Sequence, residues 1–189
     1  MKTAICSLKS VSPYSQSKKF STPKEARETH EDHEKRVWRE RCHVGEDGHI
    51  FIPPMAFANS LKEAAKYLSI PVPGAGKATY TKNFEAGVMV IDPLMLSIKI
   101  DDVKGEWLHL NSDGKRGGGK RVDKCYPLIP SWSGVVEYHI LDDLIVQPVF
   151  ERVLTASGAL IGIGRFRPRN CGYYGRFLVE NIKWTESEL

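Results

Sequence analysis

The sequence predicts an α+β protein with a ferredoxin-like βαββαβ core that carries a charged insertion and a basic hairpin arm. Two segments, 55–68 and 146–160, place apolar residues at the spacing of one helical face. Strand-like segments lie on both sides of each, and clusters of Pro, Gly and Ser separate the elements. A length of 189 residues fits one domain, which we place at 1–189.

The first part of the chain predicts a strand followed by a charged insertion. Residues 2–11 partly alternate between apolar and polar side chains, as strands do. The insertion spans about residues 17–48, and its segment 24–41 is almost entirely charged, with only Val37 and Trp38 as apolar anchors. This composition predicts an exposed helix, or a segment that orders on binding.

A short strand and a helix follow the insertion. Residues 49–52 predict the strand, which Pro53 and Pro54 end. The helix predicted over 55–68 begins next, and Pro54 suits the first turn of such a helix. Residues that break regular structure come after it, namely Pro71, Pro73, Gly74 and Gly76.

The second half of the chain predicts further strands, an arm and a second helix. Residues 86–100 are strand-like and interrupted at Asp92-Pro93, and residues 101–133 predict a hairpin arm with a Gly-rich basic tip. The remaining elements are a strand at 134–141, a helix at 146–160 and a last strand at 177–184. Without the insertion and the arm, this order is close to βαββαβ, which ferredoxin-like folds share with RRM-like folds.

Positive charge is concentrated in two places, although the net charge is only +4. No acidic residue lies between Glu151 and Glu180, whereas this stretch holds Arg152, Arg165, Arg167, Arg169 and Arg176. The tip of the arm sets a single Asp123 against Lys115, Arg116, Lys120, Arg121 and Lys124. Local basic clusters on a nearly neutral protein predict a face that binds a polyanion.

Several classes of protein are disfavoured by the sequence. No apolar run approaches the roughly 20 residues that cross a bilayer, and residues 1–10 lack the apolar core of a secretory signal. None of the four cysteines forms a C-x-x-C pair. We therefore expect a cytoplasmic protein with free thiols and no membrane partner.

The Gly-rich segment 162–177 combines three features that nucleic-acid grooves require. Glycines at 162, 164, 172 and 175 allow close approach of the backbone to a phosphate. Arginines, whose planar guanidinium groups suit phosphate, lie in the same segment as Gly162 and Gly164, namely Arg165, Arg167, Arg169 and Arg176. So do aromatic rings that could stack on bases, namely Phe166, Tyr173 and Tyr174. The alternative is a Gly-rich turn with core aromatics and solvated arginines. A dinucleotide fingerprint is disfavoured, because G-x-G here follows a helix and precedes a strand.

The other basic residues are weaker candidates for the same interface. The arm tip contributes Lys115, Arg116, Lys120 and Arg121, and the insertion contributes Lys18, Lys19, Arg39 and Arg41. Three consecutive glycines between the basic pairs of the arm would let its tip wrap around a backbone. A solvated charge run is the alternative for both sets.

No catalytic or metal site stands out. The insertion contains His30, Glu31, Asp32 and His33, followed by Cys42 and His43, but this spacing matches no common zinc pattern. A solvent-exposed charged helix is the favoured interpretation. No nucleophile has an evident base and orienting group. We expect a protein that is not an enzyme and that holds no cofactor and no metal.

Two longer motifs stand out, namely H-I-F-I-P-P-M-A-F-A-N-S-L-K-E-A-A-K-Y-L at 49–68 and G-I-G-R-F-R-P-R-N-C-G-Y-Y-G-R-F at 162–177. They resemble the repeat-associated (RAMP) family, and in particular the backbone subunit of CRISPR effector complexes. The first has Pro54-Met55-Ala56-Phe57 where the family pattern often has a glycine. The resemblance implies that the Gly-rich loop lies against RNA and that segment 101–133 corresponds to a thumb-like hairpin. Some RAMP subunits cut RNA with an Asp in the insertion region, where Asp32 is the nearest candidate.

Three hypotheses about function follow. The first is a non-catalytic protein that holds single-stranded, guide-like RNA and associates with itself or with CRISPR-type effector subunits. The second is a phage-type inhibitor that mimics a backbone subunit and binds a protein partner. The third is a metal-dependent ribonuclease that uses Asp32 or Glu31.

Overall fold

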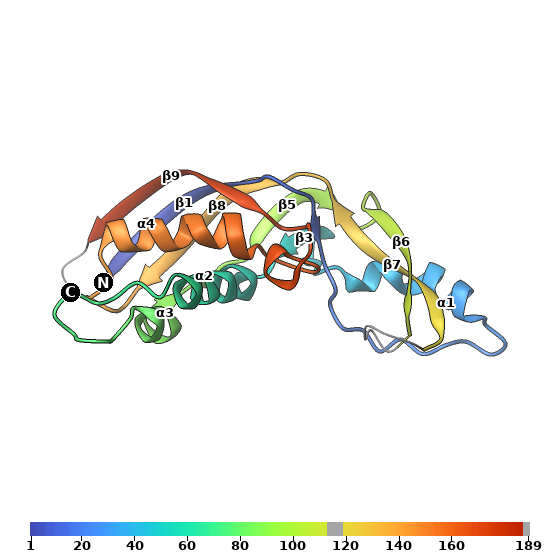
Figure 1. Ribbon diagram of the computed structural model, residues 1–189. Coiled ribbons are helices and arrows are strands. Elements are labelled where there is room, and N and C mark those ends of the chain that lie inside the picture. The colour runs from blue at the N-terminus through green and yellow to red at the C-terminus, as the bar shows by residue number, and fades with distance from the viewer. Residues whose placement is uncertain (113–118, 187–189) are drawn as a thin grey trace.

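A four-stranded antiparallel sheet forms the centre of the computed structural model, which describes residues 1–112 and 119–186 (Figure 1). Its strands lie in the order β4-β8-β1-β9, so that β1 pairs with β8 on one side and β9 on the other. Their bounds are β1 Lys2–Ser10, β4 Val88–Met89, β8 Ser133–Ile140 and β9 Phe177–Glu186. The strands predicted at 2–11, 134–141 and 177–184 are confirmed, and the protein is of mixed α+β class.

Two helices cover one face of this sheet. Helix α2 (Pro54–Leu68) and helix α4 (Gln147–Ala156) lie side by side below the strands in Figure 1. Both have Pro in the first turn, where the missing N–H leaves no hydrogen bond unmade. The two predicted helices are confirmed within a few residues.

The alternation of β1 explains where the core lies. Ala4, Cys6 and Leu8 are buried toward the helices, where rings from several elements meet. The ring of Phe150 in α4 lies 5.4 Å from that of Tyr138 and 5.6 Å from that of Trp184. Apolar burial of this kind supplies most of the free energy of folding.

Helix α4 ends in a feature that prepares the Gly-rich loop. A π-helical turn, Ser157–Ile161, follows α4 and stops at Gly162, whose φ is 73°. Ser157 Oγ lies 2.8 Å from Ser60 Oγ of α2, in a buried hydrogen bond that ties the two helices together. The loop therefore leaves α4 directly beside α2.

The region between α2 and β8 departs from the prediction. A helix α3 (Thr81–Gly87) precedes β4 and includes residues that were predicted as strand. Its seven residues bury Phe84, whose ring stacks on that of Phe150 at 6.5 Å, and this single anchor is too little to predict a helix. The predicted break at Asp92-Pro93 is confirmed, because β5 (Leu94–Lys99) leaves the main sheet and pairs with β3 (His49–Ile52).

The insertion and the arm pack on each other and form one projection, at the right of Figure 1. The arm is the predicted hairpin, with β6 (Lys104–Asn111) paired to β7 (Arg121–Ile129), and β2 (Tyr14–Ser15) pairs with β7. Lys115 and Arg116 lie outside the described residues. Helix α1 (His30–Val37) and the 3₁₀ turn η1 (Trp38–Arg41) lie against this hairpin, with Val37 and Trp38 buried as the predicted anchors.

The helix predicted over 24–41 is shorter than expected. Thr29 Oγ1 accepts a hydrogen bond from the Asp32 N–H (3.1 Å), so that Thr29 caps the helix and fixes its start at His30. Arg27, with a φ of 66°, is incompatible with a helix at that point. No helix among the described residues is long and apolar enough to span a bilayer.

Candidate nucleic-acid interface

The Gly-rich loop folds back onto the chain that leaves β1. The N–H of Arg165 donates to Ser15 O (2.9 Å), and the N–H of Gly175 donates to Pro13 O (2.7 Å). Gly164 has a φ of 77°, and a Cβ there would lie 2.5 Å from Ser15 O, so only glycine fits. At this position, close packing of two backbones explains the glycine without a ligand.

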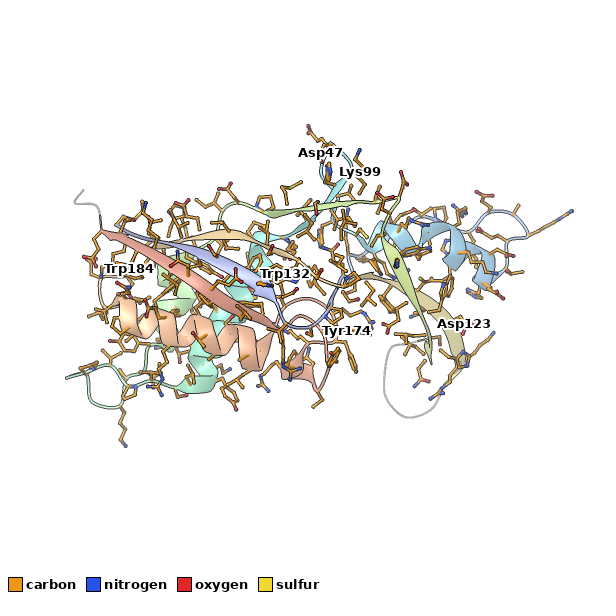
Figure 2. All side chains as sticks on the ribbon, turned by 90° about the horizontal axis from the view of Figure 1, so that it is seen from above. Asp47, Lys99, Asp123, Trp132, Tyr174 and Trp184 are labelled. Atoms are coloured by element: carbon orange, nitrogen blue, oxygen red, sulfur yellow. The ribbon has the colours of Figure 1, made fainter. Side chains whose placement is uncertain are left out.

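Arg165 joins the loop to the arm. Its Nη2 lies 3.2 Å from Glu106 Oε2 of β6, and its Cζ lies 3.9 Å from the centre of the Tyr126 ring of β7. Tyr174 Oη donates a hydrogen bond to the same Glu106. Figure 2 shows Tyr174 between the helix-covered sheet and the arm that carries Asp123.

Burial shifts the pKa values of Arg165 and Tyr174 in this cluster. Burial lowers the pKa of the Arg165 guanidinium, while Tyr126 and Glu106 act in the opposite direction. Burial, followed by the hydrogen bond to Glu106, raises the pKa of Tyr174 to about 12. Arg165 and Tyr174 therefore hold the arm against the loop, with their polar atoms largely engaged inside the protein.

Arg41 has a similar internal role. Its Nη1 lies 2.8 Å from Glu34 Oε1, both side chains are about 10% exposed, and the Cys125 N–H donates to the same oxygen (2.7 Å). The Arg41 Cζ also lies 5.0 Å from the Tyr126 ring centre. The hydrogen bond from Cys125 joins the insertion to β7, and the ion pair within the insertion leaves little of the Arg41 charge accessible.

The other loop arginines differ in how far they are paired. Arg167 Nη2 and Arg169 Nε lie 2.7 Å and 2.9 Å from the two carboxylate oxygens of Glu63 on α2. Arg176 is half-buried, and its Nε donates to Ala159 O (3.2 Å). Among the described residues, Arg176 has no carboxylate within 4.0 Å.

The aromatic rings of the loop differ in how far they are exposed. Tyr173 and Phe166 are 59% and 48% exposed, so their rings are available for stacking. Tyr174 is half-buried, with its ring centre 5.8 Å from that of Tyr173 and 6.3 Å from that of Phe166. Two of the three rings therefore present a free surface, and the third supports them.

A hollow of about 370 Å³ lies where the Gly-rich loop, the start of α2 and both ends of the insertion meet, and we call it the central groove. Each of these four segments contributes polar side chains to it. They include Gln16, Lys18, His43, Asn59, Arg165, Arg167 and Asn170. The two motifs at 49–68 and 162–177 thus contribute to one site.

His43 is the histidine that lines the central groove. Its backbone N–H donates to Gln16 Oε1 (2.7 Å), and Gln16 Nε2 donates in turn to Phe51 O (2.7 Å). Burial, and then the nearby Lys18, lower the pKa of the half-buried imidazole. His43 is therefore neutral near neutral pH, and it would gain charge if an anion entered.

Three cations of the insertion, Lys18, Lys19 and Arg39, form no ion pair with any described residue. Lys18 and Lys19 are exposed, and neither forms an ion pair with any described residue. The Arg39 Cζ lies 4.3 Å from the centre of the Trp38 ring, and Arg39 has no carboxylate within 4.0 Å in the described part of the chain. On the arm, Lys120 and Arg121 are also exposed, but they do not line the central groove.

The open face of the main sheet is the site that RRM-like recognition would use. Its described side chains in the paired region include Thr3, Ser7, Val135, Glu137, His139, Asn181 and Lys183, and none is aromatic. Tyr138 and Trp184 contact Phe150 on the helix-covered face instead. The exposed rings of Tyr173 and Phe166 therefore lie on the loop and not on this face of the sheet.

Glu31 and Asp32 lie in the first turn of α1 and form contacts within that helix and its N-cap. Asp32 Oδ2 accepts a hydrogen bond from Thr29 Oγ1 (2.6 Å), and Glu31 lies 2.7 Å from Lys35. His33 Nε2 lies 3.0 Å from Thr22 O. Within residues 1–112 and 119–186, no cluster of three or more His, Cys, Asp or Glu side chains is arranged to hold a metal ion.

Sequence reasoning did not identify Gln16, His43 or Asn59 as site residues. They lie on segments that meet only after folding, and none belongs to a basic cluster. The protein matches no protein-family model and no curated protein. The function is therefore inferred from the residues and their geometry.

Proposed function

We propose that this chain is a non-catalytic RNA-binding protein that holds single-stranded RNA in the central groove. The observation that carries the proposal is the convergence of the Gly-rich loop, the start of α2 and the start of the insertion on one cationic hollow. Lys18 and Arg167 supply charge there, while Asn59 supplies hydrogen-bonding groups. Phosphate contacts would dominate the affinity, which would therefore fall steeply with salt.

The order of the sheet supports a ferredoxin-like core of the RAMP type. Numbered along the chain, the strands of the sheet β4-β8-β1-β9 are the second, third, first and fourth. Helix α2 lies between the first and second strands in sequence, and α4 lies between the third and fourth. This is the arrangement of two interleaved βαβ units. The resemblance to CRISPR backbone subunits agrees with it, because both motifs contribute to the central groove.

Single-stranded rather than duplex RNA fits the shape and chemistry of the groove. Its volume of about 370 Å³ accommodates individual nucleotides better than a rigid helix. Elsewhere on the same loop, outside the lining of the groove, the exposed rings of Tyr173 and Phe166 give unpaired bases a surface, and each stacked base contributes roughly 1–3 kcal/mol. Duplex recognition would instead need contacts across two successive grooves of an A-form helix.

The proposal assigns no catalytic role to Asp32 or Glu31. Asp32 is engaged in capping α1, and Glu31 pairs with Lys35. An acid without a placed metal or base is not a catalytic site. Bound RNA should therefore remain intact in the presence of Mg²⁺ or Mn²⁺.

Binding is tested with two matched variants and a fluorescein-labelled 12-nucleotide oligouridylate. Met55 lines the groove and is 54% exposed, whereas Met89 of β4 is 42% exposed and does not line it. We expect M55E to weaken binding at least ~10-fold by placing a negative charge in the groove, and M89E to leave binding unchanged. A carboxylate at the first turn of α2 is compatible with the helix dipole, so M55E should fold.

Purification at moderate salt supplies the second readout. A raised 260/280 absorbance ratio that ribonuclease lowers would support the proposal. A protein that carries no nucleic acid, and that fails to bind the oligouridylate at 50 mM salt, would contradict it. If M55E and M89E reduced the affinity for the oligouridylate equally, the RNA would not bind in the central groove.

A further inference from the structure

A second hollow, of about 440 Å³, lies on the insertion, and we call it the insertion pocket. Lys18, Lys19 and Arg39 line it together with apolar side chains. It is separate from the arginine-rich loop, none of whose residues line it. The insertion therefore carries a concave cationic surface of its own.

The positive charge of the insertion pocket is not neutralised from within. Lys18, Lys19 and Arg39 form no ion pair with any residue that the structure describes. Glu40 is the acidic residue of the lining, and its Oε2 accepts a hydrogen bond from Thr22 Oγ1 (2.5 Å). Three cations against one carboxylate leave a net positive site, which favours an anion.

Arg39 is held in a defined orientation. Its guanidinium lies over the buried Trp38 ring at 4.3 Å, and its Nε is buried without a hydrogen-bond partner. Stacking on the indole ring of Trp38 fixes the plane of the guanidinium and removes part of its hydration shell. A guanidinium prepared in this way suits a phosphate better than a freely rotating surface side chain does.

An apolar wall faces these cations. Phe20, Val44 and Ile100 form it, and the Phe20 ring is positioned by the guanidinium of Arg41, whose Cζ lies 4.9 Å from its centre. A wall of this kind beside a cationic rim matches the two halves of a nucleotide, which are an apolar base and a charged phosphodiester. A simple inorganic anion would leave the wall unused.

The insertion pocket continues the central groove. Lys18 lines both hollows, and its N–H donates to Arg41 O (3.0 Å), so that the segment around Lys18 runs beside the segment that bears His43. A strand that leaves the central groove past Lys18 would therefore enter the insertion pocket. The two hollows form one path, with Lys18 at the junction.

We infer that the insertion pocket is a subsite for one further nucleotide of the same RNA strand. Lys18, Lys19 and Arg39 hold its phosphodiester, and its base lies on the wall that includes Phe20. This inference rests on the proposed function, because it extends the same strand beyond the groove. It gives the insertion a role in setting the length of RNA that the protein covers.

The test compares a labelled uridine dinucleotide with the 12-nucleotide oligouridylate by fluorescence anisotropy. The dinucleotide is short enough to occupy the central groove without the insertion pocket, so only the long oligonucleotide gains from the pocket. In K19Q/R39Q, we expect a loss of roughly 10-fold for the 12-mer, less than twofold for the dinucleotide, and a shallower salt dependence. The control K66Q/R152Q removes the same charges from exposed positions on α2 and α4, and should leave both affinities unchanged.

The outcomes separate the subsite from the proposed function. Thermal unfolding checks that K19Q/R39Q folds, and the single variant K19E repeats the test at an exposed position that forms no ion pair with the described residues. If the unmodified protein binds both lengths and the variants change neither, or change both equally, the subsite is wrong and the central groove stands. If the unmodified protein binds neither length, the proposed function fails and the subsite fails with it.

Discussion

The cations of the Gly-rich loop and those of the insertion look alike in the sequence but differ in the folded protein. Arg165, Arg167 and Arg169 lie within 3.2 Å of carboxylates from β6 and α2. Lys18 and Lys19 have no such partner among the described residues. The number of basic residues in a segment therefore overestimates the positive charge that a ligand would encounter, because ion pairs formed on folding neutralise some of these residues.

The difference assigns distinct tasks to the two regions. The loop arginines join the loop, the arm and α2, so their main contribution is to the stability and shape of the groove. Under the proposed function, the unpaired Lys18, Lys19 and Arg39 of the insertion contribute mainly to RNA affinity. Other cations of the insertion are paired within it, namely Lys35 with Glu31, Arg36 with Glu28 and Arg41 with Glu34.

The largest expected effect is on stability, from R165M. Removing this guanidinium leaves Glu106 half-buried and without its cation, which should lower the free energy of unfolding by about 2 kcal/mol. Chemical denaturation followed by circular dichroism measures it. K19Q should change the same quantity by no more than ~0.5 kcal/mol, and equal effects of the two variants would remove the distinction between the regions.

The next effect is a gain of affinity from E63Q. Neutralising Glu63 releases Arg167 and Arg169 toward the groove, and we expect RNA to bind about threefold more tightly. The control E85Q removes one negative charge from an exposed position on α3. Titration of the labelled 12-mer measures both, and a gain in E85Q equal to that in E63Q would show that only the net charge matters.

A smaller effect concerns pH and His43. Burial and Lys18 hold the pKa of His43 below its usual value, whereas a bound phosphate would raise it, so RNA binding takes up a proton. Affinity should therefore rise about threefold as the pH falls from ~7.5 to ~5.5, and H43Q should lose most of this rise. The stability of the free protein changes in the opposite direction. Because His43 binds its proton more tightly in the unfolded chain, the free energy of unfolding decreases as the pH falls through the pKa of the unfolded chain. A pH dependence that H43Q retains in full would exclude His43 from the interface.

The smallest effect separates the thiols of the two regions. Cys171 is exposed in the loop, whereas Cys42 is buried in the insertion, where burial raises its pKa to about 12. Iodoacetamide should therefore modify Cys171 in the native protein while Cys42 reacts only on unfolding, as mass spectrometry of the peptides can show. Rapid native labelling of Cys42 would mean that the insertion opens from the arm.

The sequence predicted the regular elements better than their contacts. The strand at 2–11, both long helices and the hairpin follow from periodicity and turn residues. The pairing of Arg167 with Glu63 and of Arg165 with Glu106 could not be predicted, because the partners are 104 and 59 residues apart. Their ion pairs depend on how α2 and the arm meet the loop.

The candidate site was predicted in part for the same reason. Glycine, arginine and tyrosine in one short segment indicated the loop, and Gly164, Arg165 and Arg167 of this segment line the central groove, whereas its tyrosines do not. His43 and Gln16 gave no local signal, because each is a single polar residue whose neighbours in the groove come from other segments. The short helix α3 was missed because one apolar anchor sets no helical period.

The most direct test of the account is photo-crosslinking of a 4-thiouridine-containing 12-mer, followed by mass spectrometry of the crosslinked peptides. We predict crosslinks to peptides that contain residues 16–20, 39–44, 53–59 and 164–170, which together line the central groove and the insertion pocket. Crosslinks confined to β1, β8 and β9 would place RNA on the open face of the sheet and contradict the account. So would the absence of any crosslinked RNA.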